Sequence, residues 1–93
     1  MRITEKALDI VASRINAALG TPEKPWIRGD GRMIAQIGNV HLYRCLGVWA
    51  LHQMVNESGG IKVVVSGDTA RSCYDQAHAY LRGLETGKEE KAA

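Results

Sequence analysis

Five side chains in the sequence are of the types that bind metal ions or act as nucleophiles. They are His41, Cys45, His52, Cys73 and His78. Structural zinc sites draw their ligands from closely spaced pairs, and these residues form no such pair. On an ideal strand His41 and Cys45 point to the same side, whereas Cys73 and His78 lie on different faces of a helix. The spacing therefore predicts no metal site, and we expect no other cofactor.

Covalent and phosphate-binding chemistry have little support in the sequence. Cys73 lies about one turn into a predicted helix, where the helix dipole could lower its pKa. It also falls in the apolar stripe of that helix, so we expect a buried thiol. The segment 66–69 opens the same helix and could hold a phosphate, although Thr69 is expected to cap the free N–H groups itself. Neither Gly-x-Ser-x-Gly nor Ser-x-x-Lys occurs, and the sequence predicts no enzyme.

Basic and aromatic residues gather around a predicted hairpin near the start of the chain. These residues are Lys24, Arg28, Arg32, Arg44, Trp26 and Tyr43. Such a mixture can bind single-stranded nucleic acid, but a solvated edge hairpin protected by its charges is the simpler interpretation. Exposed Trp and Arg side chains often carry the energy of protein interfaces. We therefore predict a partner-binding site made of Trp26, Arg28, Arg32 and Arg44.

The overall composition limits the classes of function. The chain has 93 residues, of which 45% are hydrophobic and 24% charged, and its formal net charge is +2. This charge is well below that of a dedicated nucleic-acid-binding protein. No signal-peptide pattern and no apolar run near 18 residues is present, and the two cysteines are too few for a disulfide scaffold. We expect a cytoplasmic protein without membrane contact.

Caps and apolar periodicity predict two helices that bracket the chain. Thr4 is a good N-cap and Gly20 can adopt the left-handed conformation after the last turn, which gives a helix at residues 4–19. A second apolar stripe follows Thr69 and gives a helix at about residues 70–84.

Five short strands are predicted between these helices. They lie at residues 26–28, 32–37, 40–44, 48–56 and 61–65. Residues 29–31 predict a tight turn. Gly38-Asn39 could form a hairpin turn that pairs residues 32–37 with 40–44, or residues 33–44 could be one bulged strand, and the sequence leaves both open.

The order of elements predicts an α+β fold, α-β-β-β-β-β-α, in which a short-stranded antiparallel meander separates the two helices. We place a single domain at residues 4–84. Residues 85–93 carry charge but no apolar stripe, and we expect them to be a disordered tail.

Two of the predicted strands are apolar on both faces. This holds for residues 48–55 and, apart from Lys62, for residues 61–65. A sheet with one solvated face should instead alternate between apolar and polar residues. Two helices can cover only one face, so we expect a second copy of the chain to cover part of the other, as a homodimer.

Several short stretches resemble a group of small uncharacterised proteins encoded by tailed phages and prophages. In this order they are Gly31-Arg32, Ile37-Gly38-Asn39, His41-Leu42, Gly47, Leu51, Asn56-Glu57 with Gly59-Gly60, and Tyr80-Leu81 with Gly83. The resemblance spans roughly residues 4–84. It departs at residues 45–49, where the phage proteins tend to have an aromatic residue and a glycine pair.

The resemblance implies a phage context. Small phage accessory proteins of this size often act by binding. They block a host enzyme or defence complex, or they sequester a signalling nucleotide. We therefore expect a non-catalytic accessory protein that binds and modulates a host protein in the host cytoplasm. The alternative, which we rank second, is a small protein that associates with nucleic acid or sequesters a nucleotide.

Overall fold

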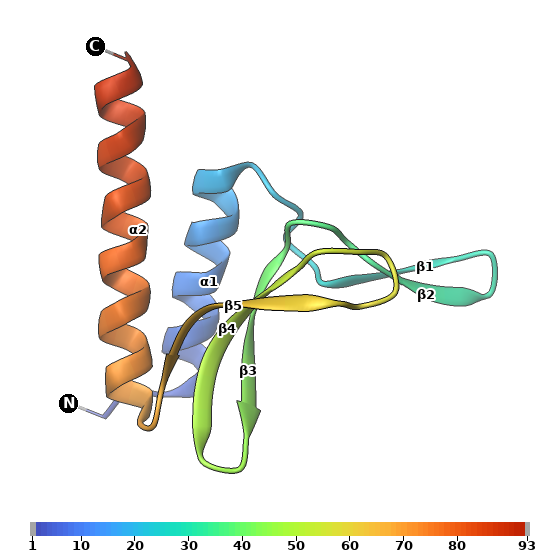
Figure 1. Ribbon diagram of the computed structural model, residues 1–93, viewed down its shortest axis with the longest axis horizontal. Helices are drawn as coiled ribbons and strands as arrows, with labels where there is room; N and C mark the ends of the chain where they lie inside the picture. Colours follow the sequence, from blue (N-terminus) through green and yellow to red (C-terminus); the bar gives the residue numbers. More distant parts are fainter. Residues whose placement is uncertain (1, 93) are drawn as a thin grey trace.

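The structure is a computed structural model that describes residues 2–92, with side chains described for residues 2–87. Helices α1 (Glu5–Leu19) and α2 (Ala70–Ala92) lie side by side against one face of an antiparallel sheet (Figure 1). The α+β class and the element order predicted from the sequence are confirmed.

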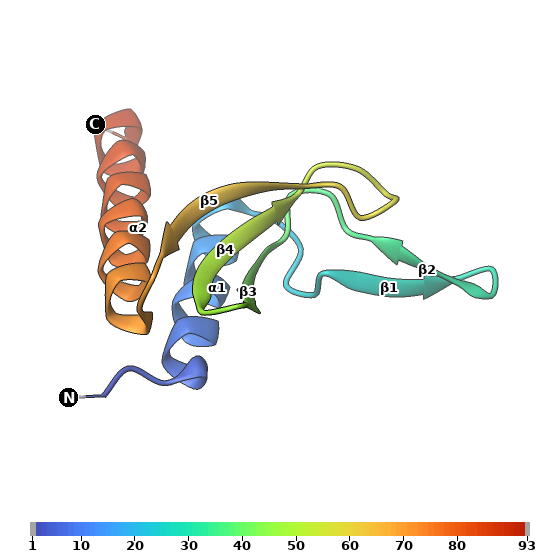
Figure 2. The same ribbon diagram turned by 60° about the horizontal axis from the view of Figure 1, so that its bottom comes forward.

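The five strands form two separate sheets instead of one meander. The strands β3 (Val40–Cys45), β4 (Val48–Met54) and β5 (Ile61–Gly67) form the sheet that the helices cover. The strands β1 (Trp26–Gly29) and β2 (Arg32–Ala35) pair only with each other, in a hairpin that projects away from the helices (Figures 1 and 2). We call this hairpin the arm.

The connection between the two sheets overturns both interpretations of residues 33–44. Residues 36–39 neither pair β2 with β3 nor continue a bulged strand. Asn39 is buried, its side chain donates to the carbonyl of Pro22 at 2.8 Å, and its own carbonyl accepts from the N–H of Met54 at 2.9 Å. Gly38 adopts φ 93°. These contacts with distant segments direct the chain from the arm into β3 instead of back along β2.

The two-residue turns of the β1–β2 and β3–β4 hairpins each contain two residues with positive φ. Asp30 (φ 48°) and Gly31 (φ 80°) form the predicted tight turn of the arm. Leu46 (φ 50°) and Gly47 (φ 82°) connect β3 to β4 in the same way. Two positive φ values in a two-residue loop are typical of a type I′ turn, which matches the twist of the flanking strands.

The two helices begin at the predicted caps. Thr4 Oγ1 accepts from the N–H of Ala7 at 3.2 Å, and Thr69 Oγ1 accepts from the N–H of Ser72 at 3.0 Å. Gly20 ends α1 in the left-handed conformation with φ 73°. Both N-terminal caps and the C-terminal cap of α1 are therefore confirmed.

The end of α2 differs from the prediction. The apolar stripe stops at Leu84, but the helix continues to Ala92. Glu, Lys and Ala dominate this stretch and are good helix formers, so elongation of an existing helix needs no apolar face. Residues 85–92, which we expected to belong to a disordered tail, are helical, and residue 93 lies outside the described residues.

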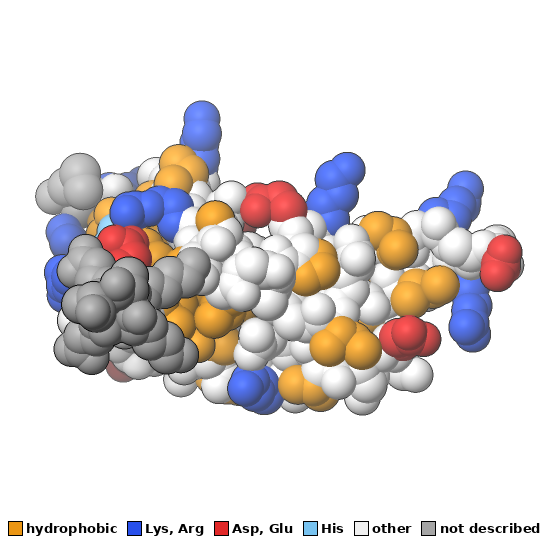
Figure 3. Space-filling view, turned by 90° about the horizontal axis from the view of Figure 1, so that it is seen from above, with side chains coloured by type: hydrophobic (Ala, Val, Ile, Leu, Met, Phe, Trp, Pro, Cys, Tyr) orange, Lys and Arg blue, Asp and Glu red, His pale blue; other side chains and the backbone are white. Residues whose placement is uncertain are grey.

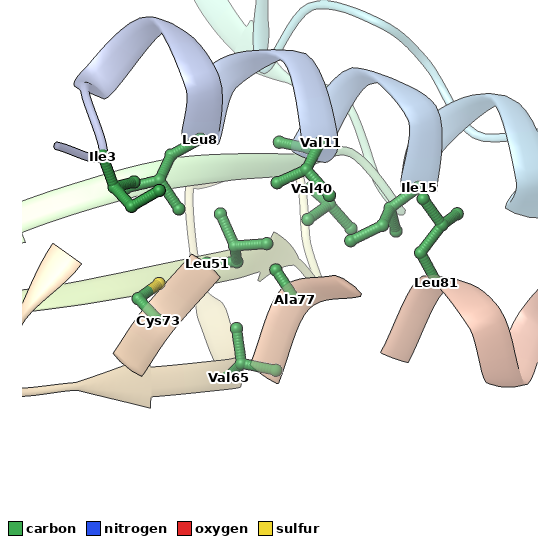
Figure 4. Close-up of a cluster of buried hydrophobic side chains, with 11 residues drawn as sticks. Ile3, Leu8, Val11, Ile15, Val40, Leu51, Val65, Cys73, Ala77 and Leu81 are labelled. Atoms are coloured by element: carbon green, nitrogen blue, oxygen red, sulfur yellow. The ribbon is translucent and has the colours of Figure 1, made fainter. Parts of the chain in front are cut away.

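The core lies between the helices and the β3–β5 sheet (Figure 4). Its buried members are Ile3, Leu8, Val11, Ala12, Ile15, Val40, Leu51, Val65, Cys73, Ala77 and Leu81. The residues from α1 and α2 belong to the predicted apolar stripes. Leu51 and Val65 face the helices, which identifies the inner face of the sheet.

One polar side chain is also buried between α1 and the sheet. Asn16 donates from Nδ2 to the carbonyl of Val40 at 2.8 Å and accepts at Oδ1 from the N–H of Val40 at 2.7 Å. Thr21 Oγ1 donates to the same Oδ1 at 2.9 Å. Because β3 is an edge strand, this side chain replaces a missing strand neighbour and attaches α1 to the sheet.

Candidate functional site

The arm carries two of the four predicted partner-binding residues near its tip. Arg28 lies opposite Met33, and Arg32 lies opposite Gly29. Directly opposite residues share a face and neighbouring residues alternate, so the two arginines project from opposite faces of the arm. The arm therefore presents positive charge on both sides.

Exposed apolar side chains accompany these arginines. Trp26, Ile27 and Met33 lie on these two short strands, and all three side chains are exposed. In the space-filling view, hydrophobic side chains alternate with Lys and Arg at the end of the molecule away from the helices (Figure 3). This mixture is typical of the residues that dominate protein interfaces.

Trp26 also braces the base of the arm. Its ring lies against Gly59, where an added Cβ would come within 2.8 Å of Cη2. The loop that contains Gly59 is held by Asn56, whose Oδ1 accepts from the N–H groups of Ser58 and Gly60 at 3.0 and 2.9 Å. The predicted binding residue therefore has a structural role as well.

A backbone hydrogen bond connects the same loop to β2. The N–H of Ala35 donates to the carbonyl of Glu57 at 3.1 Å. A two-stranded hairpin is only marginally stable alone, and the loop at residues 55–60 supplies the support it needs. We call residues 55–60 the bracing loop.

Arg44 lies elsewhere, which corrects the predicted basic cluster around the first hairpin. It is near the end of β3, beside the β3–β4 turn, and Figure 1 shows this turn far from the arm. Its guanidinium forms an ion pair with Glu5 and lies over the Trp49 ring, 3.9 Å from the ring centroid. The structure brings Trp26, Arg28 and Arg32 together and separates Arg44 from them.

A cleft of about 760 Å³ lies where the N-termini of the two helices meet, beside Arg44. Arg2, Arg44 and Arg71 line it, and Glu5 and Asp68 contribute opposing charges. The sequence raised the possibility that free N–H groups at the start of α2 hold a phosphate. As predicted, Thr69 caps the helix itself, because its Oγ1 accepts from the N–H of Ser72. The cleft thus combines mixed charges with an already capped helix end.

The opposite side of the β3–β5 sheet faces away from the helices, and we call it the outer face. Strand alternation and register assign ten residues to it: His41, Tyr43, Cys45, Val48, Ala50, His52, Met54, Ile61, Val63 and Ser66. None of them carries a formal charge when the histidines are neutral. The outer face is therefore the uncharged surface on which the sequence predicts a second copy.

An aromatic cluster occupies the middle of the outer face. Tyr43 stacks on His52 with ring centroids 4.3 Å apart and an interplanar angle of 19°. His41 meets His52 edge to face at 6.1 Å, and in the tautomer with the proton on Nδ1 it donates to Asn39 Oδ1 at 3.1 Å. Burial lowers the pKa of both histidines, and the proximity of His52 lowers the pKa of His41 further. We call these two residues the histidine pair.

The cysteines occupy contrasting environments. Cys73 is fully buried, and burial raises the pKa of its thiol, so the predicted core thiol is confirmed. Cys45 is exposed on the outer face. Among the residues that the structure describes, no group of three or more His, Cys, Asp or Glu side chains is placed to hold a metal ion.

Comparisons with known proteins identify no relative. No protein-family model, curated protein or solved structure matches the chain. Within residues 2–92, no helix is long and apolar enough to cross a membrane. The resemblance to small phage proteins therefore stays a prediction.

Proposed function

We propose that the protein is a non-catalytic accessory protein of the small phage type that binds and modulates a host protein through its arm. The observation that supports this most is the projecting hairpin, which exposes apolar side chains between arginines. Exposed apolar side chains are unfavourable in water, and their burial against a partner contributes favourably to the free energy of binding. The proposed site of action is the host cytoplasm.

The charges of the arm indicate the kind of partner. Arg28 and Arg32 lie within a few residues of each other in sequence and project from opposite faces, with Asp30 between them at the turn. A partner groove with acidic residues on both walls would pair with both arginines, and the same walls would cover Met33 on the face of Arg28 and Ile27 on the face of Arg32. We therefore propose an acidic groove on a host protein as the binding surface.

Charge reversal on the arm tests this proposal without disturbing the brace at Trp26. Arg28→Glu with Arg32→Glu should weaken binding at least tenfold, which corresponds to about 1.4 kcal/mol. The matched control is Lys6→Glu with Arg82→Glu, because both residues are exposed on the helices and the change in net charge is the same.

The assay begins with tagged wild-type, arm and control proteins in a lysate of the bacterial host. Captured proteins are identified by mass spectrometry, and the affinity of the purified partner is then measured by calorimetry. We expect a host protein that wild type and control retain and the arm variant loses. Equal retention of every captured protein by the arm variant would refute the role of the arm.

Nucleic-acid binding is the competing outcome. With Arg44 elsewhere, the basic residues in or near the arm are Lys24, Arg28 and Arg32, so at most three phosphate contacts form. The affinity for duplex DNA would then depend on salt with a log–log slope of about −2.7. Micromolar binding to DNA or RNA with this slope, lost in the arm variant, would replace the host-protein proposal.

A further inference from the structure

The outer face of the β3–β5 sheet carries a second inference, independent of the arm and its partner. We infer that this face is the contact surface for a second copy of the chain, with two sheets packed face to face about a twofold axis. The inference rests on the chemistry of the face, its exposure and its area.

The chemistry favours an identical partner over a different one. In a twofold interface each residue near the axis lies close to its own copy, so a charge there would meet a like charge. The outer face avoids this because none of its ten residues is Asp, Glu, Lys or Arg. The arm has the contrary pattern, since its exposed apolar side chains stand beside arginines. Charge complementarity thus assigns the arm to a partner of different sequence and the outer face to a copy.

The chain leaves the rim of the outer face exposed, whereas Ala50, His52 and Met54 on the central strand are buried within the chain. Tyr43, Val48, Ile61 and Val63 are all exposed, and Tyr43 and Val48 lie beside the small residue Ala50 on the central strand. Large side chains around a small one produce a shallow relief into which the same relief of a second sheet can fit. Facing sheets pack about 10 Å apart with interdigitated side chains.

The area of the face fits a dimer of moderate affinity. Three strands about 4.8 Å apart and seven residues long at about 3.4 Å per residue cover roughly 14 by 24 Å, or about 340 Å². Two copies would bury on the order of 700 Å² before side-chain relief is added, which is below the standard interface of about 1,600 Å². We therefore expect dissociation in the range of tens of micromolar, about 6 kcal/mol.

The total exposed surface agrees with an uncovered interface. The chain exposes 6052 Å². A compact monomer of its mass, 10.2 kDa, is expected to expose about 5,300 Å². The surplus of about 750 Å² is larger than the roughly 340 Å² of the outer face, and the projecting arm accounts for part of the rest.

A pair of matched substitutions tests the inference. Val63 on the outer face and Ile10 on α1 are exposed to the same degree, 55% and 54%. Val63→Lys places two like charges in the proposed interface, whereas Ile10→Lys adds the same charge on the helix layer. Val48→Lys, at the other end of the outer face, provides a second variant if Val63→Lys fails to fold.

Sedimentation velocity from 5 to 200 µM, with melting curves as a check on folding, gives the readout. We expect wild type and Ile10→Lys to dimerise with equal affinity, and Val63→Lys or Val48→Lys to raise Kd at least tenfold. A wild-type protein that stays monomeric at 200 µM would overturn the inference. So would a dimer that folded Val63→Lys and Val48→Lys variants leave intact.

Discussion

Replacement of Asn16 by alanine should destabilise the protein severely, although the residue lies on a helix and its change removes little volume. The side chain is 1% exposed and holds both the N–H and the carbonyl of Val40. Within residues 2–92, no strand lies on that side of β3 to replace it. In the variant, the buried N–H and carbonyl of Val40 lose their partner, whereas the hydroxyl of Thr21 keeps the backbone carbonyl of residue 16 within 3.4 Å.

The magnitude follows from these lost partners. A buried polar group left without a hydrogen bond costs about 1–3 kcal/mol. Two such backbone groups give about 2–6 kcal/mol, and a value of about 3 kcal/mol is already a large part of the 5–15 kcal/mol that stabilises a typical domain. At about 4–8 °C per kcal/mol for a domain of this size, Tm should fall by about 12–24 °C.

Thermal and urea unfolding followed by circular dichroism measure this loss. Ser13→Ala is the matched control, because it removes a hydrogen bond from the same helix at the surface, to Glu23. The control should stay within about 0.5 kcal/mol of wild type. If Asn16→Ala also unfolds within 1 kcal/mol of wild type, the reasoning that this side chain satisfies the edge strand fails.

Four further predictions address other regions. Leu46→Asn should raise stability by about 0.5–1 kcal/mol, seen as a higher Tm, because Leu46 is 98% exposed and has a positive φ that asparagine tolerates better. In native protein at about 1 µM, below the Kd expected for the dimer, a thiol reagent should modify exposed Cys45 quickly and buried Cys73 only on unfolding, and mass spectrometry after each interval should show one modified site. The folded-state pKa values of the histidine pair lie below the ordinary 6.5, so the unfolded chain binds more protons than the folded protein as the pH falls. The free energy of unfolding should therefore be largest above pH 6.5 and decline below it. Urea titrations at pH 7.5 and 5.5 should show this decline, and His52→Gln should reduce it. Truncation after Leu84 should leave Tm almost unchanged, since the exposed ion pair of Glu85 with Arg14 is worth at most about 1 kcal/mol; a loss of several degrees would show that the end of α2 stabilises the domain.

The helices were predictable because their signals are local. Thr4, Gly20 and Thr69 cap the helices through atoms a few residues away, so the sequence alone contains the information. The apolar stripes likewise depend only on spacing within one element. The end of α2 was missed because amphipathicity was used as the criterion, whereas an exposed helix of good formers needs none.

Strand pairing was not predictable in the same way. Gly38-Asn39 has the composition of a hairpin turn, but Asn39 bonds to Pro22 and Met54, which no local pattern reveals. Asn16 escaped notice because a search for apolar periodicity ignores a polar residue within the stripe. In the sequence, the structural role of Asn16 was indicated only by its position directly after Ile15, near the end of the buried face of α1.

The candidate site was predictable only where its residues are close together in the sequence. Trp26, Arg28 and Arg32 lie within one hairpin, so proximity in sequence implied proximity in space. Arg44 was grouped with them only because residues 32–37 and 40–44 were expected to pair. Once that pairing is absent, Arg44 lies at the far end of its strand, where Glu5 and Trp49 hold it.

Several of the stretches that resemble small phage proteins now have a common structural explanation. Gly31-Arg32 completes the turn at the tip of the arm, and Gly38-Asn39 connects the arm to the larger sheet. Within the bracing loop, a Cβ at Gly60 would come within 2.3 Å of the Asn56 side chain that holds the loop, and one at Gly59 would strike Trp26. Packing thus favours glycine and asparagine where the loop supports the arm. In this chain these stretches build and support the arm, which is the part of the molecule that we propose to bind the host protein.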